Sequence, residues 1–307
     1  MSVTPPSRRS RRNPATPWLF AAPGLGLLLI FLVLPFVLAF VLSFTDQRLI
    51  GNDDLGTDFV GLRNYRRLFD DDSFWAALRN NTLFVAVVAP LQSALALGLA
   101  LLVNQPLKGS RIFRTIYFMP VATTMAVVAV IWSLLYSPDA GVINRLVNLL
   151  SLGQIGPQDW LRDPSLVMPA VMVLSIWQGV GFQMLVFLAG LQAIPTDLYE
   201  AARLDGATPR QLFTRITLPM LKNTSIFVVV TTTIYAFQLY TQVQIIASSG
   251  AAAPVDSFRT LVMFMVHEGF RNGKIGYASA ISVVFFVLVL AISLLQRGLL
   301  REERVVT

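Results

Sequence analysis

The chain has 307 residues, of which 55% are hydrophobic and only 13% are charged, and its mean hydropathy is +0.64. Soluble domains carry about 25% charged residues, so this composition excludes a soluble globular protein and predicts an integral membrane protein. The chain has no cysteine and a single histidine, His267. We therefore expect no disulfide and no thiolate or histidine-rich metal site.

Six charge-free stretches predict six membrane-spanning helices. Residues 13–45, 80–107, 115–138, 164–196, 223–255 and 275–296 contain no Asp, Glu, Lys or Arg. Each stretch reaches the ~20 residues that a helix needs to cross a bilayer. The first is too long for a signal peptide, so we expect it to be retained. The sequence thus predicts an all-α polytopic protein with spans at roughly 18–44, 80–103, 116–136, 167–191, 224–247 and 276–296.

The placement of Lys and Arg predicts that both termini are cytoplasmic. With the N-terminus inside, the inner segments hold 14 cations and 5 acids, and the outer segments hold 10 cations and 12 acids. This excess of inner cations is what the positive-inside rule requires. Residues 1–16 then form a flexible basic tail, for which we favour contact with anionic lipid over a nucleic-acid role. The transmembrane domain spans 17–300, and 301–307 form a second cytoplasmic tail.

The predicted connections differ in character. Outer loop 45–79 carries aromatic residues near helical spacing, so we expect a short amphipathic helix that anchors at the interface rather than on a partner. The short basic link after the second span makes spans two and three antiparallel neighbours. Outer loop 137–166 is expected to be helical at 142–150. Outer loop 248–274 is expected to start as a flexible segment able to contact an outside partner, with His267 in no special role.

A polar segment separates the fourth and fifth spans on the cytoplasmic side. Asp197 and Glu200 have the spacing of a capping box, and Thr208 and Gln211 have the spacing of a second one. Gly206 between them suits the positive φ that often follows a helix end. We therefore expect two short helices joined at a tight corner, which is the form of a docking element.

The chemistry that the spans lack limits the function. They contain no Asp, Glu, Lys, Arg or His, whereas proton-coupled carriers need carboxylates or histidines and voltage sensors need an arginine ladder. The chain also has no GxxxxGK[ST] phosphate loop and no hydrolase cluster. If the chain transports a solute, the energy must therefore enter from another subunit, through the cytoplasmic double helix.

The double helix resembles the EAA loop of bacterial ABC importer permeases in Glu200-Ala201-Ala202, Asp205-Gly206 and Ile216-x-Leu218-Pro219. The similarity covers nearly all of residues 15–300. One departure is Ala247-Ser248-Ser249-Gly250-Ala251, where relatives often carry Thr-Gly-Gly-Gly-Pro. Similarity to the carbohydrate-uptake branch, of the maltose and glycerol-3-phosphate type, extends to Ile194-Pro195, Gly61-Leu62-x-Asn64-Tyr65, Phe113-Arg114-Thr-Ile-Tyr117-Phe-Met-Pro120 and Trp177-x-Gly179.

The resemblance implies a type I ABC importer permease fold in the bacterial inner membrane, with a coupling loop at about 195–220 that docks on an ATPase. It implies a second permease subunit, expected to make a heterodimer, two ATP-binding-cassette ATPase subunits and an extracytoplasmic substrate-binding protein. ATP and Mg would bind to the ATPase, so this chain would hold no cofactor and would not be an enzyme. The coupling residues would be Glu200, Ala201, Ala202, Asp205, Gly206, Leu218 and Pro219, with Leu218-Pro219 ending the second helix.

Polar and aromatic residues inside the fourth and fifth spans are the candidates for the solute path. Thr232, Tyr235 and Gln238 recur every three residues, close to one helical face. In maltose-type relatives a Trp-x-Gly-x-x-aromatic segment lines the sugar site, while Ala236 and Leu239 here fall where polar residues would sit. Packing and hydrogen bonds between helices are the alternative role for each residue. The candidates are Trp177, Gly179, Phe182, Thr232, Tyr235 and Gln238.

The sequence therefore predicts half of the translocation path for a sugar. An oligosaccharide is favoured over a glycerol-3-phosphate-type cargo, because a phosphate would prefer cations in its path. Two alternatives stay open: an ion-coupled secondary transporter or channel, and a membrane scaffold that conducts nothing.

Overall fold

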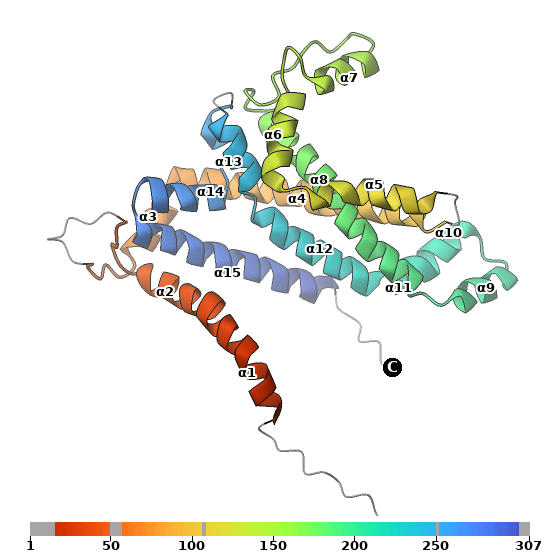
Figure 1. The fold of residues 1–307 in the computed structure, drawn as a ribbon, viewed down its shortest axis with the longest axis horizontal. Helices are drawn as coiled ribbons and strands as arrows, with labels where there is room; N and C mark the ends of the chain where they lie inside the picture. Colours follow the sequence, from red (N-terminus) through yellow and green to blue (C-terminus); the bar gives the residue numbers. More distant parts are fainter. Residues whose placement is uncertain (1–15, 50–56, 106–108, 250–251, 301–307) are drawn as a thin grey trace, which may run out of the picture.

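The computed structural model describes residues 16–49, 57–105, 109–249 and 252–300 (Figure 1). The two predicted cytoplasmic tails lie almost entirely outside these ranges. The described residues form helices with one isolated β-bridge, between Thr45 and Phe59. In chain order they are α1 (Thr16–Leu28), π-helical η1 (Leu29–Val33), α2 (Leu34–Leu42), α3 (Arg63–Phe69), α4 (Asp72–Val103), α5 (Ser110–Ala122), α6 (Met125–Leu135), α7 (Val142–Leu150), α8 (Val167–Gln192), α9 (Thr196–Leu204), α10 (Pro209–Leu212), π-helical η2 (Phe213–Thr217), α11 (Leu218–Met220), α12 (Lys222–Phe237), α13 (Thr241–Ser248), 3-10 helical η3 (Val255–Ser257), α14 (Leu261–Val266), π-helical η4 (His267–Arg271) and α15 (Ile275–Leu300).

The helices confirm the all-α polytopic class. Five described stretches are long and apolar enough to cross a membrane, and the bent pair α5–α6 makes a sixth if it counts as one span. Figure 1 shows α9 to α11 at one end of the bundle and α3 at the opposite end. The second span starts at Asp72, earlier than predicted, because the Asp71 carboxylate caps α4 by accepting from the Ser73 N–H at 2.9 Å.

The span predicted over 116–136 is not one continuous helix, because α5 and α6 meet at a bend of 100°. Thr123 and Thr124 between them adopt extended backbone, with ψ of 138° and 140°. Before the bend, α5 lies so close to α8 that a Cβ at Gly181 would be 2.0 Å from the Tyr117 carbonyl oxygen. After it, α6 packs mainly on α13 and also contacts α8. A charge-free run predicts membrane depth, but it does not predict the direction of the helix.

The predicted fifth span, 224–247, is also interrupted in the structure. The helix α12 ends at Phe237, and α13 begins at Thr241. Between them Tyr240 leaves the helical region, with φ −142° and ψ −58°. Non-helical backbone at membrane depth is tolerated only where protein satisfies it or where it lines a cavity. Both conditions apply here.

Two side chains from other elements pair with the backbone at this break. The Asn81 amide of α4 donates to the Phe237 carbonyl at 3.1 Å, and its oxygen accepts from the Leu261 N–H at 2.8 Å. The Thr260 hydroxyl donates to the Leu239 carbonyl at 2.7 Å. All of these bonds are buried. We call Asn81 and Thr260, with these bonds, the Asn81 bracket.

The outer segment 248–274 contains ordered helix and not only loop. Thr260 caps α14 by accepting from the Met263 N–H, at 3.3 Å. Leu261 and Phe264 of α14 are buried in a cluster with side chains of α3, α4 and α15. The sequence signal for this helix is a Thr followed by six apolar residues. This apolar run is much shorter than the ~20 residues that predict a membrane span. His267 lies in the π-turn after α14 and is half-exposed.

The motif Gly61-Leu62-x-Asn64-Tyr65 ties the end of the first span to the predicted outer helix, which is α3. The buried Asn64 amide donates to the carbonyls of Ser43 and Thr45, at 2.9 and 2.8 Å. The Tyr65 hydroxyl lies 2.7 Å from the Ser43 Oγ. Gly61 turns the chain with φ of +56°. The helix therefore anchors the outer end of α2.

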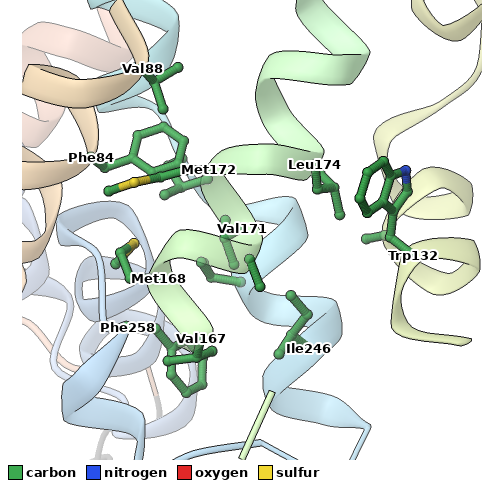
Figure 2. Close-up of a cluster of buried hydrophobic side chains, with 14 of the residues drawn as sticks. Phe84, Val88, Trp132, Val167, Met168, Val171, Met172, Leu174, Ile246 and Phe258 are labelled. Carbon is green, nitrogen blue, oxygen red and sulfur yellow. The ribbon is translucent and has the colours of Figure 1, made fainter. Parts of the chain in front are cut away.

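The core is organised around α8. This helix shares its most extensive interface with α4 and also packs against α5, α6 and α12. Figure 2 shows the largest cluster, in which Val171 and Leu174 of α8 lie between Phe84 on one side and Trp132 of α6 on the other. By contrast, α2 packs against α15 at the edge of the bundle, and α1 leaves the bundle (Figure 1).

Replacement of Asn81 tests the bracket. Asn81→Leu keeps the side-chain size but leaves the Phe237 carbonyl and the Leu261 N–H buried without partners. We expect the free energy of unfolding to fall by roughly 2–6 kcal/mol, at about 1–3 kcal/mol for each of the two buried unpaired groups. Thermal unfolding of the purified chain in detergent measures this. Asn148→Leu, at an exposed position on α7, is the control. Equal unfolding temperatures for the two variants would contradict the assignment.

Candidate functional site

A cavity of about 420 Å³ lies beside the break in the fifth span. Helices α4, α5, α6, α8, α12 and α13 all contribute to its wall. Its described lining contains no Asp, Glu, Lys, Arg or His, so every polar group in it is neutral. These polar residues are Gln92, Ser175, Gln178, Gln183, Thr232, Tyr235, Gln238 and Gln242.

The structure brings five of the six predicted path residues together in this cavity. Trp177 is the exception, because it does not line the cavity and packs instead on Trp132 of α6, with 5.5 Å between ring centroids. Residues two apart on a helix point about 200° away from each other. Trp177 and Gly179 therefore face different sides of α8. The five lining residues are Gly179, Phe182, Thr232, Tyr235 and Gln238, and Ala236 and Leu239 join them.

Sequence reasoning missed several polar residues of the wall. Gln92 belongs to α4, and its signal in the sequence is a glutamine inside a charge-free apolar stretch. Gln183 donates to the Thr232 Oγ1 at 2.5 Å, and Gln242 donates to the Ser175 Oγ at 3.2 Å. Both bonds join α8 to the fifth span. Thr232 therefore does take part in hydrogen bonding between helices, as the alternative role required.

Gly179 has a steric role in the cavity. A Cβ at this position would lie 2.4 Å from the Gln92 Nε2, which is closer than real Cβ contacts. The glycine therefore leaves room for the Gln92 amide to lie against α8.

At the end of the bundle opposite α3, the helices α9, α10 and α11 form the predicted double helix (Figure 1). Thr208 and Gln211 make the predicted capping box, and Gly206 has φ of +80°. The predicted box of Asp197 and Glu200 is wrong. The helix α9 starts at Thr196, two residues before the start that a cap at Asp197 predicts, with Pro195 at its cap position and no side-chain cap bond. Asp197 therefore lies in the first turn of the helix.

Leu218-Pro219 does not end the second helix, because helical backbone continues to Met220. The preceding π-turn η2 accommodates the proline, with the Leu218 N–H donating to the Phe213 carbonyl. A proline removes one helical hydrogen bond and crowds the carbonyl four residues before it, and a wider turn relieves this. The same arrangement precedes Pro35, where the Leu34 N–H donates to the Leu29 carbonyl.

The double helix presents an exposed surface. Its two arms are held together by a 3.0 Å hydrogen bond between the Tyr199 hydroxyl and the Thr217 Oγ1. Glu200 makes no side-chain hydrogen bond or salt bridge within the described residues, and it lines a groove of about 720 Å³ with Tyr199 and Arg203. Leu204, the last residue of α9, is 90% exposed. Among the other motif residues, Ala202 is half-buried, and the exposed ones are Ala201, Asp205, Gly206, Leu218 and Pro219.

Known proteins resemble the chain over almost its whole length. The "Probable ABC transporter permease protein YurN" of Bacillus subtilis is 36% identical, over 93% of this chain and 96% of the relative. The "Lactose transport system permease protein LacF" of Rhizobium radiobacter is 33% identical, over 99% of this chain and 100% of the relative. These identities support common ancestry along the whole chain.

A solved structure shares the fold. It is a bacterial alginate ABC transporter in complex with an alginate pentasaccharide-bound periplasmic protein. The matching chain has a TM-score of 0.77 and 22% identity, over 92% of this chain and 94% of that one. Residues 92–305 match the family described as "Binding-protein-dependent transport system inner membrane component". The chain therefore belongs to this family, as a multi-pass permease subunit of an ABC importer in the inner membrane.

Proposed function

We propose that the chain forms half of the translocation path for a neutral sugar and that separate ATPase subunits drive it through α9 to α11. The observation that carries the proposal is the cavity at membrane depth, whose polar lining consists only of amides, hydroxyls and a phenol. Such groups bind sugar hydroxyls by hydrogen bonds, and Phe182 and Tyr235 offer aromatic surface for the sugar ring. The path is completed by a second permease subunit, which we propose to be a different chain.

The cargo follows from the charge of the cavity. A phosphate or carboxylate buried at this depth needs a compensating cation, and the described lining has none. We therefore favour a neutral oligosaccharide over a glycerol-3-phosphate-type solute. The name of the lactose permease among the relatives supports a sugar, and the solved neighbour supports delivery by an extracytoplasmic binding protein.

The coupling proposal depends on the exposed double helix. The Glu200 side chain makes no hydrogen bond or salt bridge within the described residues, so its carboxylate is available to a partner. Ala201 gives α9 a small side chain that permits close approach, and Leu204 adds an exposed apolar contact. We propose that two ATPase subunits, which bind ATP and Mg, dock at this end of the assembled importer.

A secondary transporter would need titratable groups or an ion site near the solute. No Asp, Glu, Lys, Arg or His lines the described cavity, and no group of His, Cys, Asp or Glu in the described residues has metal-binding geometry. We therefore propose that a partner subunit, rather than an ion gradient acting on this chain, supplies the energy for transport.

Glu200→Ala tests the coupling. The side chain is exposed, so we expect the variant to fold normally but to lose most uptake or to hydrolyse ATP without import. Uptake and ATPase activity of the importer in proteoliposomes measure both effects. Asp139→Ala, an exposed acid in an outer connection, is the control and should behave as wild type. Normal assembly and transport by Glu200→Ala would exclude the docking role.

Tyr235→Ala distinguishes a subunit that forms the solute path from a membrane scaffold that conducts nothing. Tyr235 is 70% exposed and lines the cavity, so its loss should cost little stability. We expect sugar uptake at limiting concentration to fall about 10-fold, as for a lost stacking and hydrogen-bonding group, with assembly unchanged. Phe227→Ala, at an exposed position of α12 outside the cavity, is the control. Unchanged uptake and selectivity in Tyr235→Ala would favour the scaffold.

A further inference from the structure

We infer that a cationic pocket on the outer side of the chain binds the phosphate group of an anionic phospholipid from the outer leaflet. The pocket has a volume of about 270 Å³ and shares no lining residue with the cavity beside the fifth span. The inference therefore does not depend on the proposed cargo. The charged residues in the described lining of the pocket are Asp46, Arg48, Arg63, Arg67 and Lys274.

The pocket lies where the first and last spans reach the membrane surface. Figure 1 shows α2 and α15 side by side, with α3 near their outer ends. The segment after α2 pairs with the turn before α15. The Leu49 N–H donates to the Gly273 carbonyl at 2.8 Å, and the Gly276 N–H donates to the Gln47 carbonyl at 2.9 Å. These bonds hold the backbone of the pocket at the depth of the lipid headgroups.

The charge of the pocket favours an anion, because four cations and one acid line it. Two of the cations have acidic partners. The Lys274 ammonium lies 2.9 Å from a Glu268 carboxylate oxygen. Arg63 lies 3.9 Å from Asp46, and both side chains are partly exposed. The other two cations are arginines that make no salt bridge within the described residues. Arginine binds phosphate oxygens by short, charge-assisted hydrogen bonds.

The two arginines without an acidic partner are Arg48 and Arg67. The Arg67 guanidinium lies over the ring of the buried Tyr277, 4.5 Å from its centroid. Asp71, four residues after Arg67, forms no salt bridge with it. Its two oxygens accept instead from the Ser73 N–H and the Tyr277 hydroxyl, each at 2.9 Å. The fold therefore orients Arg67 and leaves its N–H donors for an anion.

The surroundings of the pocket favour a lipid over a free anion. Apolar side chains of α2 and α15 continue inward from it and stay exposed, among them Phe40, Phe286 and Val287. Trp75, near the start of α4 on the same outer side, is half-exposed, and tryptophan suits the headgroup level. A phospholipid can place its phosphate at the arginines and its acyl chains along α2 and α15. A free anion would use only the arginines.

Lipid titration of the complete importer, purified in an uncharged detergent, tests the inference. Native mass spectrometry counts the bound molecules of phosphatidylglycerol or phosphatidylcholine at each lipid concentration. We expect phosphatidylglycerol to bind roughly 10-fold more tightly at one site per copy of the chain, because the choline group would add a cation to a cationic pocket. Inorganic phosphate at a matched concentration should not displace the lipid, because it has no acyl chains.

Two variants locate the lipid. Arg48→Gln and Arg67→Gln should each weaken phosphatidylglycerol binding at this site roughly 10-fold, as expected for the loss of a charge-assisted contact. Arg67→Lys keeps the charge and should restore part of the binding. Arg66→Gln, on the same helix α3 but outside this pocket, is the control and should bind as wild type. Arg48 is exposed, so Arg48→Gln carries the test if Arg67→Gln does not assemble.

Three results would overturn the inference. The first is unchanged phosphatidylglycerol binding in both Arg48→Gln and Arg67→Gln. The second is an equal loss in Arg66→Gln, which would indicate diffuse surface charge instead of a site. The third is displacement of the lipid by inorganic phosphate, which would assign the pocket to a free anion. None of these measurements involves sugar uptake, so the proposed function is tested separately.

Discussion

The break in the fifth span is the constraint on which the rest of the site depends. It leaves the carbonyls of Phe237 and Leu239 without helical partners at a depth where water does not supply them. The Asn81 bracket supplies both donors and ties α4, the break and α14 to one another. The backbone of the break is therefore paired by side chains that lie outside the cavity wall.

The helix α12 connects this cavity to the coupling end. It begins at Lys222, directly after α11, and its later turns carry Thr232 and Tyr235 into the cavity wall. Its start is held by the fully buried Leu221 and by Gly190 of α8, where a Cβ would lie 2.7 Å from the Thr224 Oγ1. In the proposed mechanism, a shift of the double helix moves α12 as a rigid element and so changes access to the cavity between two states.

Much of this organisation could be predicted from the sequence, because charge-free length and capping chemistry are local properties. The spans, the Thr208–Gln211 box and the Gly206 corner belong to this class. The 100° bend after α5 and the break before Tyr240 could not be predicted, because they depend on contacts with distant residues such as Gly181 and Asn81. For the same reason helical spacing placed most of the candidate residues on one cavity wall, whereas the direction of Trp177 and the presence of Gln92 and Gln183 in that wall required the packed structure.

The central claim is that the amide-lined cavity holds the cargo, with α12 as the link to the ATPase. A structure of the complete importer with its imported sugar tests this most directly. The account predicts density for the sugar between Gly179 and Tyr235, in contact with the polar side chains of the cavity wall. Density for the sugar along a different path, with this cavity closed or filled by side chains, would contradict it.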